Sequence, residues 1–133
     1  MDARRDEVLD RLRALLAKAP EEVVAAYLFG SRARGTEKPS SDVDVGVLLA
    51  RPPEPILGSV ARRLEAEMER GTGLPAQVVA LNEAPVDLVH RVLRDGVLLL
   101  DRDPLARTRF EVRVRNEWFD LQPILRRYRE AWS

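Results

Sequence analysis

The strongest constraint on the fold is an apolar segment, residues 23–29, that ends abruptly at a glycine. A short continuous apolar run of this kind, bounded by turn residues, is typical of a buried β-strand. Gly30 and Ser31 follow at once. Because a glycine permits a tight turn and a close approach of the backbone to a ligand, the sequence predicts a turn with an exposed backbone at the end of a central strand.

A second strand-like segment, residues 42–49, follows a polar loop that contains Pro39. Side chains alternate along a strand, so Asp42 and Asp44 are expected on one face and the valines at 43, 45 and 47 on the core face. Two carboxylates held close together repel each other unless a cation neutralises them. Because Mg²⁺ commonly binds one or two carboxylates together with substrate phosphates, we predict that Asp42 and Asp44 hold Mg²⁺.

The turn at Gly30 supplies the complementary half of such a site. Backbone N–H groups near Ser31 and Arg32 favour anions, and the Ser31 hydroxyl can donate to a phosphate oxygen. Arg32 and Arg34 are candidates for clamping a triphosphate. A Gly-Ser turn alone is usually only a turn, and an Asp-x-Asp pair alone usually lies on a solvated strand face. Found together, they predict a site for a metal-bound nucleoside triphosphate.

The rest of the chain predicts helices that cover a small mixed sheet. Further strands are expected at 76–81 and 97–100 from their apolar runs. Helical spacing predicts a short turn at 31–34 and longer helices over 2–19, from Ile56 to about 71, over 85–96 and over 104–132, with Pro123 kinking or breaking the last. This order fits an α/β (α+β) fold in one domain, 1–133, with a core of about 20–101 and a C-terminal helical segment 103–132.

Composition limits the classes of function. The chain has 22 basic and 22 acidic residues and no cysteine. The balanced charge argues against general nucleic-acid binding, and the lack of cysteine excludes disulfides, thiolate metal sites and cysteine nucleophiles. No apolar run approaches the roughly 20 residues that span a bilayer, and the charged N-terminus does not resemble a signal peptide. We therefore expect a cytoplasmic protein with no membrane association.

Several side chains outside the motif have two interpretations. His90, the single histidine, is expected to be structural. Tyr128 is expected to pack rather than to accept a transferred group, and the arginines of the last helix are expected on a solvated face. The last helix also carries a heptad-like apolar seam and aromatic residues that form either core or a docking face for a partner; these are Val114, Trp118, Phe119, Leu121, Leu125, Tyr128 and Trp132.

The motif resembles a known signature. Gly30-Ser31, then ten residues, then Asp42-x-Asp44 is similar to the nucleotidyltransferase fold of the polymerase-beta superfamily, and Phe29–Gly35 with Ser41–Val45 resembles its minimal nucleotidyltransferase (MNT) branch. The resemblance implies transfer of a nucleoside monophosphate, usually AMP, from a Mg²⁺-bound triphosphate such as ATP. It also implies a frequent partner, an all-helical HEPN toxin, which the MNT antitoxin can adenylylate on a tyrosine.

Carried over to this chain, the resemblance assigns the triphosphate to Gly30 and Ser31, and it makes Asp42 and Asp44 the catalytic, metal-binding acids. The third carboxylate of the family lies on the strand after the second long helix, where this chain has Gln77. Nearby Ala80 often has an acidic counterpart, and Glu83 is not expected to face the site. A third acid would act as a base or bind a second metal, whereas glutamine only forms hydrogen bonds.

Three functions therefore stay open. The first is AMP transfer from Mg-ATP to a hydroxyl of a partner toxin. The second is an MNT-fold antitoxin that binds nucleotide and neutralises its partner by contact, with turnover weakened or lost. The third, transfer to a small molecule such as an aminoglycoside, is disfavoured because such relatives are longer and carry a second domain. The sequence does not decide the acceptor, the nucleotide base or the oligomeric state.

Overall fold

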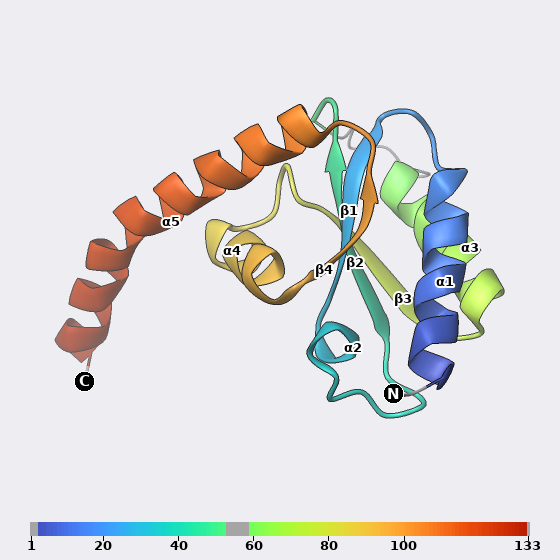
Figure 1. The fold of residues 1–133 in the computed structure, drawn as a ribbon. Coiled ribbons are helices and arrows are strands. Elements are labelled where there is room, and N and C mark those ends of the chain that lie inside the picture. The colour runs from blue at the N-terminus through green and yellow to red at the C-terminus, as the bar shows by residue number, and fades with distance from the viewer. Residues whose placement is uncertain (1–2, 53–58, 133) are drawn as a thin grey trace.

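A four-stranded mixed sheet forms the centre of the computed structural model, which describes residues 3–52 and 59–132 (Figure 1). The spatial order of the strands is β3-β2-β1-β4. Strand β1 is antiparallel to both β2 and β4, whereas β2 and β3 are parallel, so the predicted mixed sheet is confirmed. The strands are β1 (Val23–Phe29), β2 (Val43–Leu49), β3 (Ala76–Ala80) and β4 (Val97–Asp101).

Five helices in the described part of the chain connect and flank these strands. The side chain of Ser59 caps α3 by accepting a hydrogen bond from the backbone N–H of Arg62 at 3.4 Å. Residue 2 and the segment around Ile56, where two helices were expected to begin, lie outside the described residues. The helices are α1 (Ala3–Ala17), α2 (Ser31–Arg34), α3 (Val60–Thr72), α4 (Val86–Asp95) and α5 (Pro104–Trp132).

The long helices cover both faces of the sheet, with α1 and α3 on one face and α4 and α5 on the other (Figure 1). The alternation predicted for β2 is confirmed, because its valines at 43, 45 and 47 are fully buried on the α1/α3 face. Leu48 belongs to the cluster on the opposite face. Since Asp44 has the same parity as Leu48, its carboxylate points to the α4/α5 face of the sheet.

Three charged side chains satisfy backbone groups at the edge of the sheet and at the end of α1. The outer edge of β3 is covered by α3, where Glu69 accepts a hydrogen bond from Ala76 N at 3.1 Å and Glu65 accepts one from Val78 N at 3.0 Å. Arg102, just after β4, donates to five backbone carbonyls between Leu16 and Val23 at 2.7–3.3 Å. Arg102 therefore satisfies carbonyls that the end of α1 leaves open.

The last helix is only partly covered by the rest of the chain. Val114 is buried, and the Trp118 ring stacks on His90 of α4 with centroids 4.4 Å apart, which agrees with a structural role for the histidine. The helix continues through Pro123 without a break, and Figure 1 shows its final part projecting away from the sheet. Tyr128 is 66% exposed, so the expectation that it packs within this chain is wrong.

No helix in the described ranges is both long and apolar enough to cross a membrane.

Candidate active site

The residues of the sequence motif gather at one edge of the sheet. Because β1 is antiparallel to β2, its C-terminal end meets the N-terminal ends of β2 and β3. The register pairs Phe29 with Asp44 and Asp44 with Gln77. The turn at Gly30, the acidic strand start and the glutamine therefore lie next to one another, with α2 beside them (Figure 1).

Glycine is required at position 30 for two reasons: the conformation of its backbone and the close approach of Asp44. Its φ of 76° and ψ of −158° lie in a region that is essentially restricted to glycine. A Cβ built on Gly30 would collide with the Asp44 carboxylate oxygen Oδ2. The carbonyl of Gly30 then accepts hydrogen bonds from Ala33 N and Arg34 N, both at 3.2 Å, which starts α2. The missing side chain is thus what lets the turn and Asp44 lie in contact.

The two carboxylates form a like-charged pair. Asp42 is exposed just before β2, and Asp44 is half-buried within it. Burial raises the pKa of Asp44, the negative charge of Asp42 raises it further, and Arg34 acts in the opposite direction. Residues 3–52 and 59–132 contain no cluster of three or more potential metal-ligating acids, histidines or cysteines. Two carboxylates with substrate phosphates nevertheless fit Mg²⁺.

Ser31 and Arg34 begin and end α2, directly after the Gly30 turn. The carbonyl of Ser31 accepts a hydrogen bond from Thr36 N at 3.0 Å, whereas its hydroxyl has no hydrogen-bond partner within the described structure. Arg34 is exposed, and its positive charge partly offsets the rise in the pKa of Asp44 that burial and Asp42 cause. Arg34 is therefore close to the carboxylate that faces the turn, while its part in triphosphate binding stays a prediction.

Arg32 has a different set of contacts from the one that the sequence suggested. It is only 5% exposed, its Nε donates to Ser41 O at 3.0 Å, and its Nη2 donates to Lys38 O and Pro39 O at 3.4 and 3.2 Å. Arg32 thus holds the loop 36–41 that leads into Asp42. Sequence reasoning missed this positioning contact, and the available signal was a polar loop whose carbonyls need donors.

Gln77 occupies the position beside Asp44 where the family resemblance implied an acid. Paired residues of parallel strands present their side chains on the same face, so Gln77 shares the face of Asp44, and it is exposed. Strand β3 then runs away from this edge, and Glu83 follows its far end. Glu83 therefore does not supply the missing carboxylate at this edge.

The sequence matches a known family over most of its length. A family model described as polymerase beta, nucleotidyltransferase covers residues 11–105. The chain belongs to this nucleotidyltransferase family. Its polymerase-beta-like nucleotidyltransferase fold comprises the observed mixed sheet, the flanking helices and a C-terminal helix. Among curated proteins, no sequence matches this nucleotidyltransferase.

Solved structures share the nucleotidyltransferase fold at low sequence identity. One is a toxin–antitoxin crystal structure with AMP-PNP, with a TM-score of 0.78 and 23% identity over 92% of this chain and 96% of that one. Another is a tri-AMPylated Shewanella oneidensis HEPN toxin in complex with MNT antitoxin, with a TM-score of 0.74 and 20% identity over 96% of this chain and 97% of that one. At these identities the likeness establishes the fold alone.

Proposed function

We propose that this nucleotidyltransferase transfers AMP from Mg-ATP to a hydroxyl of a HEPN-type helical partner, and that it acts as the antitoxin of that pair. The observation that carries the proposal is the contact between the Gly30 turn and Asp44 at the edge of the sheet. Because of this contact, one triphosphate would be able to reach both the turn, as its phosphate site, and the carboxylate, as its metal ligand. The structural neighbours that contain AMP-PNP and an AMPylated toxin support the same reaction class.

Each part of the substrate has a candidate contact. The backbone at Gly30 and the Ser31 hydroxyl would bind phosphate oxygens, and Arg34 would offset negative charge beside Asp44. Asp42 and Asp44 would hold Mg²⁺, which supplies charge neutralisation on the phosphates when bound. Arg32 would keep Asp42 in place through the loop 36–41. An acceptor hydroxyl would then attack the α-phosphorus in line: a P–O bond to the acceptor forms, the bond from the α-phosphorus to the departing pyrophosphate breaks, and the hydroxyl proton passes to water.

The exposed side chains on the C-terminal half of α5 are evidence for a protein partner. Phe119, Ile124, Tyr128 and Trp132 are between 55% and 83% exposed. Large aromatic side chains and arginines dominate the binding energy of many interfaces, and the arginines at 126, 127 and 129 lie among these apolar residues. We propose that this half of α5 contacts the HEPN partner, because the neighbouring folds occur in complexes of that kind.

A second function is favoured by Gln77. The amide beside Asp44 neither accepts the proton of an attacking hydroxyl nor adds a negative ligand for a second metal ion. The alternative is therefore an antitoxin that binds nucleotide but neutralises its partner by contact, with weak or no transfer. The two functions share the nucleotide site and the partner, and they differ only in turnover.

The deciding experiment incubates the protein with ATP labelled at the α-phosphate, Mg²⁺ and a co-encoded HEPN protein. Transfer predicts label on the partner that disappears in Asp42→Ala and persists in Asp87→Ala, a control on an exposed acid of α4. A tight complex without label would instead support neutralisation by contact. The absence of both label and complex would refute both functions.

A further inference from the structure

Asp42 is exposed and lies one residue before β2, so the strand ladder does not fix its position directly. The peptide groups on both sides of it are nevertheless held by hydrogen bonds. The carbonyl of Ser41, before it, accepts one from Arg32 Nε at 3.0 Å. The N–H of Val43, after it, donates one to Pro75 O at 2.8 Å. The backbone of Asp42 is therefore fixed at the edge of the sheet before any metal binds.

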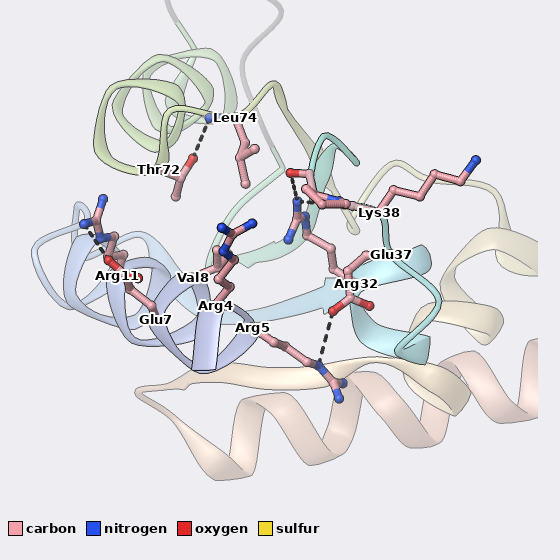
Figure 2. Close-up of a pocket in the computed structure, with 11 residues that line it drawn as sticks. Arg4, Arg5, Glu7, Val8, Arg11, Arg32, Glu37, Lys38, Thr72 and Leu74 are labelled. Atoms are coloured by element: carbon pink, nitrogen blue, oxygen red, sulfur yellow. Dashed lines mark hydrogen bonds and ion pairs between the residues drawn. The ribbon is translucent and has the colours of Figure 1, made fainter. Parts of the chain in front are cut away.

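Arg32 is the one buried charged residue in the described part of the chain, with 5% of its surface exposed. A buried charge is tolerated when its polar atoms are hydrogen-bonded. Here Nη2 donates to the carbonyls of Lys38 and Pro39 at 3.4 and 3.2 Å, in addition to the contact that Nε makes. Figure 2 shows the guanidinium directed at this loop. These donors therefore bind the loop rather than a phosphate.

The short helix that carries Arg32 is itself tied to α1. Arg5 of α1 donates from Nη2 to the carbonyl of Ala33 at 3.2 Å, and its Nε lies 3.9 Å from Glu37 (Figure 2). Ala33 also packs against the core cluster between the sheet and α1/α3. Because both α2 and the loop 36–41 are joined to one long helix, the base from which Arg32 reaches Ser41 is fixed.

Arg32 joins the two halves of the proposed nucleotide site. It lies in α2, directly after the Gly30 turn that forms the phosphate half, and its guanidinium holds the peptide next to Asp42 in the metal half. Mg²⁺ demands a near-octahedral arrangement of oxygen ligands, so carboxylates and phosphates must be placed accurately relative to each other. The contact between Arg32 and the loop sets this placement on the side of Asp42.

We propose that Arg32 is a positioning residue that couples the metal half of the site to the phosphate half, and that it does not bind the nucleotide itself. The proposal rests on the nucleotide site of the proposed function. With Arg32 in place, Asp42 is held where it shares a metal ion with the phosphates, so nucleotide affinity depends on Mg²⁺. Without Arg32 the loop is released, and binding keeps only the part that the Gly30 turn provides.

The test is calorimetric titration of wild type and Arg32→Lys with AMP-PNP, once in Mg²⁺ and once in EDTA. Lysine keeps the charge, but its compact ammonium group does not reproduce the planar fork that spans these carbonyls. Wild type is expected to bind at least tenfold more tightly in Mg²⁺ than in EDTA. Arg32→Lys is expected to bind less than threefold more tightly in Mg²⁺, with an affinity in EDTA within twofold of wild type. Equal weakening under both conditions would overturn the proposal, because a phosphate ligand acts with and without metal.

The matched control is Arg102→Lys. Arg102 also donates to several backbone carbonyls, but it follows β4 at the edge of the sheet opposite the Gly30 turn. This variant is expected to lose stability in urea unfolding and to keep the wild-type ratio between the affinities in Mg²⁺ and in EDTA. An equal fall of this ratio in the control would overturn the proposal, because general loss of stability would then explain the result.

The wild-type protein provides a second measurement that needs no substitution. The NMR signal of Arg32 Nε–H is expected to be protected from solvent exchange by Ser41 O and to keep its chemical shift when AMP-PNP binds in EDTA. A shift larger than that of the Ser31 amide would identify Arg32 as a nucleotide ligand and overturn the proposal. No binding of AMP-PNP by wild type in either condition would remove the nucleotide site and the proposed function with it. Binding with a Mg²⁺ effect that Arg32→Lys retains would overturn the role of Arg32 alone.

Discussion

Substitution of Gly30 by alanine tests whether this residue shapes the nucleotide site. A matched control then distinguishes that effect on affinity from the loss of stability that backbone strain alone causes. The backbone of Gly30 has φ 76° and ψ −158°, and an alanine there costs about 1–3 kcal/mol of stability. The added Cβ would also meet Asp44 Oδ2, so the carboxylate must move. A misplacement of about 1 Å in a reacting site costs on the order of a hundredfold in rate.

The matched control is Gly73→Ala at the C-terminal end of α3. Gly73 also has a positive φ, 73°, but its added Cβ would meet nothing within 4 Å. This variant is expected to lose about 1–2 kcal/mol of stability from the left-handed backbone and to keep its nucleotide affinity. Urea unfolding measures the first effect, and titration with Mg²⁺ and AMP-PNP measures the second.

Gly30→Ala is expected to bind Mg²⁺ and AMP-PNP at least tenfold more weakly than wild type, a loss of about 1.4 kcal/mol. The folded fraction must be confirmed by unfolding before the titration. Wild-type affinity in folded Gly30→Ala would contradict this prediction, because it would mean that the contact between Gly30 and Asp44 does not shape the nucleotide site. Equal loss of affinity in Gly73→Ala would refute it too, because strain alone would then explain the result.

Three further variants test a helix cap, the partner surface and the role of Gln77. Arg102→Ala removes five hydrogen bonds to backbone carbonyls at the end of α1 and the segment that follows it and is expected to cost about 1–3 kcal/mol in urea unfolding; a change below about 0.5 kcal/mol would contradict its capping role. Tyr128→Ser with Trp132→Ser is expected to weaken HEPN binding at least tenfold at unchanged stability, and unchanged affinity would exclude this part of α5 from the interface. Gln77→Asp restores an acid beside Asp44 and is expected to raise the rate of AMP transfer, so a rate no higher than wild type would show that Gln77 does not limit turnover.

The local pattern was enough to predict most of the elements and the outline of the site. The apolar run 23–29, the alternation in β2 and the helical spacing of 104–132 each determine an element through contacts between near neighbours in sequence. A shared site for the Gly30 turn and Asp44 was also predictable, because adjacent strands joined by a loop bring the end of one next to the start of the other.

Long-range polar contacts were not accessible in the same way. Arg32 was expected to face a phosphate, but its guanidinium binds loop carbonyls up to nine residues away. Arg102 donates to carbonyls that lie 79 to 86 residues earlier in the sequence. Such contacts depend on where the tertiary fold leaves carbonyl groups open, which no residue spacing encodes. Tyr128 was expected to pack, and its exposure shows that a periodic apolar seam does not identify the surface that covers it.

The most direct test of the account is a crystal structure of the protein grown with AMP-PNP and Mn²⁺ in place of Mg²⁺, with anomalous scattering used to locate the metal. We predict an anomalous peak coordinated by Asp42 and Asp44, with the triphosphate on the backbone of Gly30 and the hydroxyl of Ser31. Well-ordered nucleotide bound elsewhere, or metal bound without either aspartate, would contradict the assignment of this edge of the sheet as the active site.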